Sequence, residues 1–385
     1  MIKQEINELK RLYTPSNCSI TRICGCYVDG EKNKKTEFKE AFLSLPEEEI
    51  FKYFELLRKT LSGSLGKNLL NLDFPLASEQ EGGTQAALLA LRDSKLKDDA
   101  LIEEFYDRVI NTYEYVGNYL ILLIHDAYDV PGKTTDGLTM DDASDTVFEY
   151  IMCCICPVNL SKPGLSYDSI NNEFHNRIRD WVVEMPETGF LFPSFNDRAT
   201  DIHSTIFYSK NPEEAHSEFV ENILGCTMPL SAGTQKEAFQ ALIEETLGDE
   251  VEYEVVKNIH ENLTEMIEEH KEIPEPLTLD KHQVKSLFEK SGVKEEKLTD
   301  FDKLYDAAAG EDTSLFVNNV ANVRTFEVKT PDVVVKVNPE RADLVNTLQI
   351  DGKRCLVIEI NDHVEVNGIT IHQGVSLEDV ADEEE

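Results

Sequence analysis

The chain has only half as many basic residues as acidic ones. Its 37 lysines and arginines stand against 74 aspartates and glutamates, which gives a formal net charge of −37. Binding to DNA depends on lysine and arginine displacing counterions from phosphates. A chain this acidic therefore repels nucleic acid and anionic membranes at long range. Any DNA contact has to be local, or has to be made through a partner protein.

The sequence also lacks long apolar runs and is poor in cysteine. The longest apolar run, residues 119–124, is far too short to cross a bilayer, and no basic segment followed by an apolar one marks a secretory signal. The 8 cysteines are sparse for 385 residues and cluster unevenly. This usage favours reduced thiols in the cytosol over a disulfide framework. We therefore expect a cytoplasmic protein without a membrane segment.

Familiar catalytic motifs are missing as well: the sequence contains no glycine-rich phosphate loop, no HExxH and no GxSxG. Its 385 residues, 41% of them apolar and 8% aromatic, are enough for two or three domains with a sizeable core. The composition therefore predicts a globular protein, and the motifs predict no bound cofactor.

The first part of the chain, residues 1–210, mixes helical and strand patterns. An apolar stripe predicts a helix at 2–12, and Pro46 followed by three glutamates predicts the start of another. The runs 119–125 and 147–158 are short, continuous and apolar, which is typical of strands buried on both faces. Together these patterns predict an α+β domain with a mixed sheet and helices, in which an acidic loop from Asp126 to Asp145 separates the two buried strands. A further strand is expected at residues 177–185.

The remaining chain divides into two further parts and a tail. Residues 211–310 carry helical stripes and predict a helical middle section. Residues 311–375 hold short alternating runs separated by Asp-Gly and Asn-Gly turns, which predict a small antiparallel β-hairpin domain. The acidic residues 376–385 are expected to be a disordered tail.

The clearest helix start lies at the junction between the first two parts. Asn211 is a favourable capping residue, and Pro212 at the first helical position is followed by two glutamates. Apolar residues at 219–224 then give the helix a buried face, and Gly225 occupies the expected C-terminal cap. We therefore predict one helix from Asn211 to Gly225.

A dense polar cluster just before this junction is the best candidate for catalysis. It contains Asp197, Arg198, Asp201 and His203. An aspartate and histidine pair with an arginine for a phosphate or carboxylate is chemically sufficient for acid and base catalysis. The alternative is a structural turn in which Arg198 ties Asp197 and Asp201 to the strand ends and the helix start.

Positive charge is most concentrated near the N-terminus, at Lys32, Lys34, Lys35 and Lys39. Clustered lysines are the side chains that contact nucleic-acid phosphates. The cluster is therefore a candidate nucleic-acid contact, and a solvated turn is the alternative interpretation.

Two cysteine-rich strands make a metal site conceivable. The candidate ligands are Cys24, Cys26, Cys154 and Cys156, and thiolates two residues apart on a strand can share a zinc ion. The C-x-C spacing differs from the C-x-x-C of zinc knuckles. The alternative is that the cysteines serve as small buried hydrophobic residues.

The acidic loop after the first buried strand is a candidate site for a hard cation, because carboxylate oxygens suit calcium and magnesium. Its aspartates are Asp126, Asp129, Asp136, Asp141, Asp142 and Asp145. Their spacing matches no EF-hand loop, so a solvated acidic loop is the alternative.

Three stretches carry a resemblance that covers essentially the whole chain: TRICGCYVDGEKNKKTEFKEAFLSLPEEE, RDWVVEMPETGFLFPSFNDRATDIHS and PLSAGTQKEAFQALIEETLG. They closely resemble a bacterial family of unknown function, whose N-terminal signature is TRICGCYVD. The resemblance implies no activity.

The order of features is also similar, more distantly, to that of the NdpA-type nucleoid-associated proteins. GNYLILLIH resembles their Gly-Phe-Val-Leu-Phe core strand, and EFVENILGC resembles their Phe-Phe-x-x-Phe-Leu-Gly motif. The pair Gln235-Lys236 and the closing hairpins fit the same order. This resemblance implies a cytoplasmic protein associated with the nucleoid, through DNA or DNA-handling enzymes, without an established reaction.

The sequence thus leads to one principal hypothesis and two alternatives. The principal hypothesis is a non-enzymatic, nucleoid-associated interaction protein that acts through protein partners of DNA metabolism and forms a homo-oligomer through the helical middle section. The first alternative is a hydrolase or nuclease that uses the cluster at residues 197–203. The second is an acidic DNA mimic that occupies the basic channel of a DNA-binding partner.

Overall fold

The computed structural model describes residues 1–133, 139–140, 146–248, 251–322, 324–360, 364–366 and 368–371. The chain forms two compact units. The N-terminal unit contains Met1–Ala238 and Lys271–Thr278, and the C-terminal unit contains Phe239–His270 and Leu279–Glu385. These units do not test the predicted boundaries at residues 210, 310 and 375, which stay predictions.

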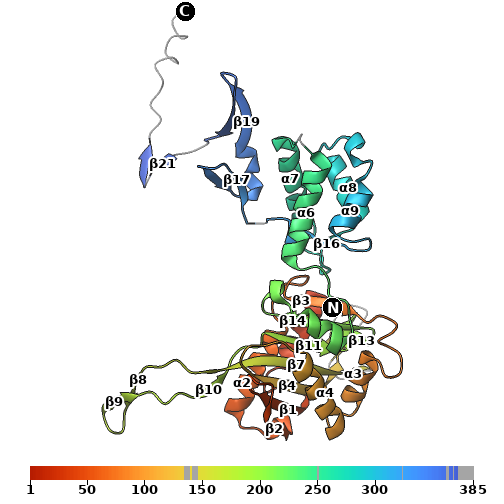
Figure 1. Ribbon diagram of the computed structural model, residues 1–385, viewed down its shortest axis with the longest axis vertical. Coiled ribbons are helices and arrows are strands. Elements are labelled where there is room, and N and C mark those ends of the chain that lie inside the picture. Colours follow the sequence, from red (N-terminus) through yellow and green to blue (C-terminus); the bar gives the residue numbers. More distant parts are fainter. Residues whose placement is uncertain are drawn as a thin grey trace, which may run out of the picture. The chain divides into compact units, whose positions relative to one another are not determined.

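An eight-stranded sheet forms the centre of the N-terminal unit (Figure 1). Its strands are β1 (Ile20–Val28), β2 (Lys34–Glu40), β3 (Leu69–Asp73), β4 (Asn118–Val130), β7 (Thr146–Leu160), β10 (Trp181–Val183), β11 (Thr188–Phe192) and β14 (Ser204–Ser209). The order across the sheet is β2-β1-β4-β7-β11-β14-β3, and β10 also pairs with β7. Short pairs complete the unit: β5 (Gly132–Lys133) with β6 (Thr139–Met140), β8 (Leu165–Asp168) with β9 (Glu173–Asn176), and β12 (Ser194–Asn196) with β13 (Ala199–Asp201).

Helices cover both faces of this sheet. On one face, α1 (Lys3–Leu12) and α2 (Glu47–Thr60) share a buried cluster with Cys154 and Cys156 of β7. On the other face, α3 (Thr84–Asp93) and α4 (Asp99–Thr112) share a second cluster with Cys153 and the 219–226 segment. Because successive strand residues point to opposite faces, the strands between these layers must be apolar at every position.

The predicted α+β class is therefore confirmed, with one correction. Every pairing in the eight-stranded sheet is antiparallel, whereas the sequence predicted a mixed sheet. Continuous apolar strands such as β4 and β7 are commonest in parallel sheets. Here their burial on both faces comes from the two helical layers, and not from parallel pairing.

The first buried strand is longer than predicted. The expected loop at Asp126 is wrong for its first residues, because β4 continues to Val130, and β7 pairs with it from Thr146 onwards. Asp126 stays in the strand because Ser19 and Tyr150 donate hydrogen bonds to its carboxylate, at 2.7 Å each. The charge that indicated a loop is satisfied by Tyr150 of β7 and by Ser19, which directly precedes β1.

The predicted helix from Asn211 to Gly225 is also wrong as one element. The chain forms a 3₁₀ turn, η2 (Pro212–Glu214), one turn of α5 (Ser217–Phe219) and a π turn, η3 (Val220–Leu224). His216 lies between them at a φ of 53°, in the left-handed region, and interrupts the helix. The predicted cap at Gly225 is confirmed by its φ of 72°.

The C-terminal unit combines helices with small hairpins. Its helices are α7 (Tyr253–Glu269), α8 (Lys281–Lys290), α9 (Phe301–Ala308) and α10 (Val317–Val320), and its short helical turns are η4 (Glu295–Leu298) and η5 (Pro339–Leu344). Its strands are β16 (Leu315–Phe316) and three antiparallel pairs: β17 (Phe326–Lys329) with β18 (Val334–Val337), β19 (Val345–Ile350) with β20 (Lys353–Ile358), and β21 (Val364–Val366) with β22 (Ile369–Ile371). The boundary between the units falls within α6 (Ala232–Leu247), and β15 is Thr278–Leu279. The predicted hairpins are confirmed, and Asp351-Gly352 forms the expected turn with positive φ at both residues. Asn367 and the predicted tail 376–385 lie outside the described residues.

Candidate functional site

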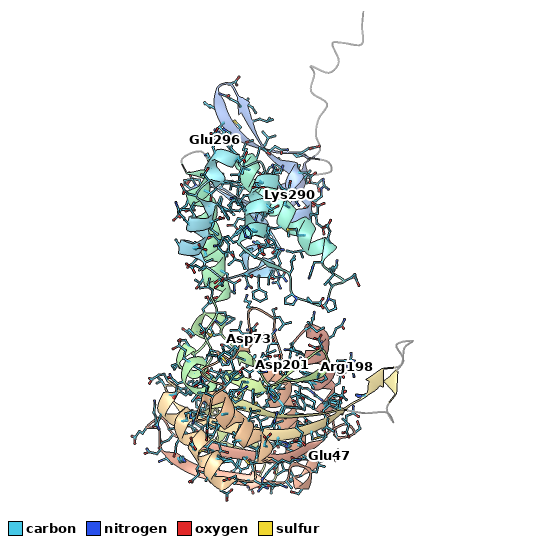
Figure 2. The ribbon with its side chains drawn as sticks, turned by 90° about the vertical axis from the view of Figure 1, so that its right-hand side faces the viewer. Glu47, Asp73, Arg198, Asp201, Lys290 and Glu296 are labelled. Carbon is cyan, nitrogen blue, oxygen red and sulfur yellow. The ribbon has the colours of Figure 1, made fainter. Side chains whose placement is uncertain are left out.

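The polar cluster that the sequence singled out lies on the β12–β13 hairpin, where Arg198 and Asp201 are labelled in Figure 2. Asn196 pairs with Ala199, so Asp197 and Arg198 form the two-residue turn. Both have positive φ, 51° and 58°, as type I′ hairpin turns require, and aspartate tolerates this conformation better than most residues. The hairpin therefore places these two side chains at its tip.

Arg198 uses its guanidinium to attach this hairpin to α1. Its Nη2 and Nε donate to the two carboxylate oxygens of Glu8 at 2.9 and 3.2 Å, and its Nη1 donates to the carbonyl of Pro131 at 3.2 Å. Two parallel hydrogen bonds from one arginine to one carboxylate are a strong, directional contact. The structural alternative was a turn in which Arg198 ties Asp197 and Asp201 to the strand ends and the helix start. The turn is present, but the guanidinium binds Glu8 of α1.

Asp201 is occupied within its own hairpin. Its carboxylate accepts hydrogen bonds from Asn196 Nδ2 at 2.6 Å, Ser204 Oγ at 2.7 Å and the backbone N–H of His203 at 3.0 Å. Partial burial by itself raises the pKa of Asp201, but these hydrogen bonds stabilise the charged form and lower the pKa overall. The carboxylate thus acts as a structural acceptor with three hydrogen bonds from its own hairpin and the residues that follow it.

His203 points to a different carboxylate from the one predicted. Its Nδ1 lies 2.6 Å from Glu79 Oε1, and its side chain is 66% exposed. The hydrogen bond that Glu79 accepts from the ring raises the pKa of His203. The side chains of Arg198, Asp201 and His203 therefore bind three different sets of partners and do not form one centre. Glu79 and Glu8 were missed because they are far away in the sequence and no local motif marks them.

The lysine cluster is neutralised by acidic side chains. The pairs are Lys32 with Glu114 at 3.6 Å, Lys34 with Asp107 at 2.8 Å, Lys35 with Asp29 at 2.6 Å and Lys39 with Asp99 at 2.8 Å. Three of the pairs join the β1–β2 hairpin to α4 or the residues just after it. Each lysine would have to give up a carboxylate before it could bind a phosphate, which weakens the case for a nucleic-acid contact.

This pairing leads to a prediction for DNA binding. The full-length protein should not retard duplex DNA in a gel-shift assay at about 50 mM salt, where phosphate contacts are strongest. The variant Lys34→Ala/Lys39→Ala should behave in the same way. Retardation by the wild-type protein that weakens with salt and disappears in this variant would show that the cluster does bind DNA.

The four candidate zinc ligands lie on opposite faces of the sheet. Cys24 and Cys26 belong to the buried cluster under α3 and α4, whereas Cys154 and Cys156 belong to the cluster under α1 and α2. Burial raises the pKa of Cys24 to about 11 and that of Cys26 and Cys154 to about 12, which disfavours the thiolate that zinc binds. Among the described residues, no group of three or more histidine, cysteine, aspartate or glutamate side chains is placed to hold a metal ion.

Two of the six aspartates of the predicted cation loop, Asp126 and Asp129, lie among the described residues. Asp126 is fully buried, and burial raises its pKa. Asp129, in the same strand, is exposed. The remaining aspartates, Asp136, Asp141, Asp142 and Asp145, lie outside the described residues, so the cation hypothesis stays a prediction for them.

The broken helix at the junction lines a cavity that the sequence did not indicate. The cavity measures about 420 Å³ and its wall includes Glu114, Glu213, Glu214, His216 and Glu218. The ring of His216 lies against Tyr113, with centroids 4.6 Å apart, and its Nδ1 is 2.9 Å from Glu218. The acidic wall makes the cavity unfavourable for anionic ligands.

A second feature that the sequence did not indicate is a β-ribbon projecting from the sheet, which we call the arm (residues 159–185). It begins where β7 extends past β4, continues through the hairpin of β8 and β9, and returns through β10 (Figure 1). At its base, Ser161 N donates to the carbonyl of Asp180 at 2.8 Å, and Arg179 Nε donates to the carbonyl of Ser161 at 2.6 Å. At its tip, Asp168 accepts from the N–H of Ile170 at 2.8 Å. The arm is therefore a hydrogen-bonded element along its length.

The arm is apolar and exposed at the same time. Ten large apolar side chains on it are exposed: Leu160, Leu165, Tyr167, Ile170, Phe174, Ile178, Trp181, Val182, Val183 and Met185. Trp181, the only tryptophan of the chain, is 55% exposed. The sequence predicted a strand at residues 177–185, of which β10 forms Trp181–Val183. Apolar spacing alone does not indicate whether a helix covers a strand, and among the described residues the side chains of this one stay exposed.

The comparison with known proteins gives one family match. The family described as "Domain of unknown function (DUF4317)" matches residues 1–369. No curated protein matches the chain. Within the described residues, no helix has both the length and the apolar content needed to cross a membrane.

Proposed function

The chain belongs to the DUF4317 family of unknown function, and we propose that it is a non-enzymatic interaction protein that docks through the arm. The observation that carries this proposal is the set of ten large apolar side chains exposed on one ribbon. Monomeric proteins seldom expose contiguous apolar patches above about 300 to 600 Å², and larger ones usually mark interaction sites. An exposed apolar ribbon is thus better explained by a binding partner than by a monomer alone.

The side chains of the predicted catalytic cluster are held in structural contacts, which supports an interaction protein over an enzyme. Arg198 is held by Glu8, Asp201 by its own hairpin, and His203 by Glu79 at the surface. A general base and its orienting partner need to lie within hydrogen-bond reach of one reacting group. These side chains instead stabilise the hairpin, and no observation favours the hydrolase alternative.

The class of partner is proposed from charge and resemblance. A net charge of −37 favours proteins with basic surfaces, as DNA-handling proteins have. The distant similarity of feature order to NdpA-type nucleoid-associated proteins supports the same class. We therefore propose a cytoplasmic protein that acts near the nucleoid through protein contacts, in which the acidic surface steers basic partners to the molecule and the arm is a separate apolar docking element.

Photo-cross-linking in cells that contain the protein tests this proposal. A photo-reactive residue replaces Phe174 on the arm, and a matched one replaces Lys52, an exposed residue of α2 whose side chain is 75% accessible. We expect discrete protein adducts from position 174 and none from position 52. The absence of adducts from the arm, with the protein folded, would show that the arm is not a docking element.

A further inference from the structure

We propose that the arm is the contact through which two copies of this chain associate, with the two arms packed on each other about a twofold axis. This inference rests on the proposed function, because it names the occupant of the docking element. A twofold contact uses the same surface on both copies, and the arm presents one continuous apolar ribbon for that purpose.

The exposed area of one arm is sufficient for such a contact. A large apolar or aromatic side chain buries on the order of 150 to 250 Å² when fully covered, so the ten partly exposed ones offer roughly 1,000 Å². A standard stable interface buries about 800 Å² per partner. Because side chains alternate between the two faces of a ribbon, one arm packed on one arm covers part of this area, and the contact lies at the small end of specific interfaces, as expected for a reversible dimer.

The backbone of the arm also lacks neighbours in the described part of the chain. β8 and β9 pair only with each other, which leaves an unpaired edge on each strand. An isolated two-stranded hairpin is marginal in water, and it needs a covered apolar face or further strands to be stable. A second arm packed across the apolar face of the first gives the hairpin that support.

The distribution of charge favours a second copy as the occupant. The arm has three basic residues, Lys162, Arg177 and Arg179, against four acidic ones, Asp168, Glu173, Asp180 and Glu184. It is therefore nearly neutral, while the whole chain carries −37. Two copies repel each other wherever their acidic surfaces meet. A neutral apolar element is the place where they can touch without that repulsion.

The length of the arm keeps the two acidic bodies apart. From Leu160 to the tip near Ile170, an extended chain spans about 30 Å at roughly 3.3 Å per residue. The Debye length at physiological ionic strength is about 8 Å. When two arms pack antiparallel along their length, the charged bodies stay about one arm length apart, which is more than a screening length.

The test uses purified full-length protein and two matched double variants. The arm variant is Phe174→Glu/Ile178→Glu, at positions that are 71% and 79% exposed. The control is Leu43→Glu/Leu76→Glu, at positions of the same unit that are 66% and 80% exposed and lie outside the arm. Light scattering over a hundredfold concentration series gives the molar mass, and Trp181 emission reports burial of the arm itself.

We expect the wild-type and control proteins to reach twice the chain mass, with Trp181 emission moving to shorter wavelength as concentration rises. The arm variant should associate at least tenfold more weakly and keep the emission of an exposed indole. A monomer at all concentrations, or a dimer that the arm variant leaves unchanged, overturns the inference. A wild-type monomer whose Trp181 emission shifts only with anionic phospholipid vesicles overturns it in favour of a membrane contact. In each of these cases the cross-links from position 174 to other proteins still decide the proposed function separately.

Discussion

Replacing Gly189 by alanine should destabilise the N-terminal unit by about 3 kcal/mol or more, or prevent it from folding. Gly189 lies in β11, opposite Cys154 of β7 and Tyr208 of β14. A Cβ atom there would fall inside van der Waals contact with the carbonyl oxygen of Cys153, and 2.8 Å from Thr60 Cγ2. The first of these is a backbone atom of the neighbouring strand, so it can move only if the β7–β11 pairing is distorted.

Urea denaturation followed by circular dichroism measures this loss, and Gly25→Ala is its control. Gly25 lies in β1 of the same sheet, and its added Cβ would meet the ring of Phe38 on β2. β2 is at the edge of the sheet and Phe38 is only partly buried, so the ring can move aside and the expected loss is about 1 kcal/mol. Equal stability of Gly189→Ala and the wild-type protein would contradict the close packing of β7 against β11.

The helices and strands of this fold were predictable where the spacing of apolar residues along the sequence matches the side chains that are buried. The apolar run at residues 119–124 predicts β4 because helices cover both faces of the sheet there. The end of the same strand was not predictable. A charged residue such as Asp126 is typical of a loop, but here Ser19 and Tyr150 donate hydrogen bonds to it and keep it in the strand. Both donors come from other parts of the chain. Local pattern thus predicts an element better than it predicts where the element ends.

The candidate site shows the same limit more strongly. Residues 197–203 are close in sequence and suggested one polar centre, but their partners Glu8 and Glu79 are separated from them by 190 and 124 residues. Spacing carries no information about such pairs, since only the folded chain brings them together. The arm was missed for the opposite reason. The sequence predicted a strand at residues 177–185, and β10 forms within it, but the hairpin of β8 and β9 was not predicted. Nothing in an apolar pattern distinguishes a covered strand from an exposed one.

His125 should make the protein less stable as the pH falls from about 6.5 to about 4. The ring is fully buried in β4, and its Nδ1 lies 2.8 Å from Thr21 Oγ1. Burial lowers the pKa of His125 to about 4, although Glu149, whose Oε2 lies 3.9 Å from Nε2, acts in the opposite direction. Lys95 and the neighbouring cations Arg92 and Lys97 add to the lowering. The folded protein therefore holds this imidazole neutral at a pH where water would protonate it.

The direction of the effect follows from proton linkage. In the unfolded chain the histidine titrates near 6.5, so between about 6.5 and 4 the unfolded state binds more protons than the folded state. The stabilisation from neutral His125 is complete above this window and is lost as the pH falls through it. The difference of about 2.5 pH units corresponds to roughly 3 kcal/mol as an upper value. Asp126 has a raised pKa and acts in the opposite sense, so a comparison must keep it constant.

The variant His125→Gln provides that comparison, because it retains Asp126 and removes only the titration at residue 125. We expect the free energy of unfolding of the wild-type protein to fall by about 2 to 3 kcal/mol relative to the variant between pH 7 and pH 4. His203→Gln is the matched control of opposite sign, since Glu79 raises the pKa of this exposed histidine and its small contribution is lost as the pH rises. Parallel curves for the wild-type protein and His125→Gln across the window would mean that the buried imidazole is protonated as readily as in water. The contact with Thr21 would then hold a charged ring, and the buried polar pairs of β4 would act as a pH-independent part of the sheet.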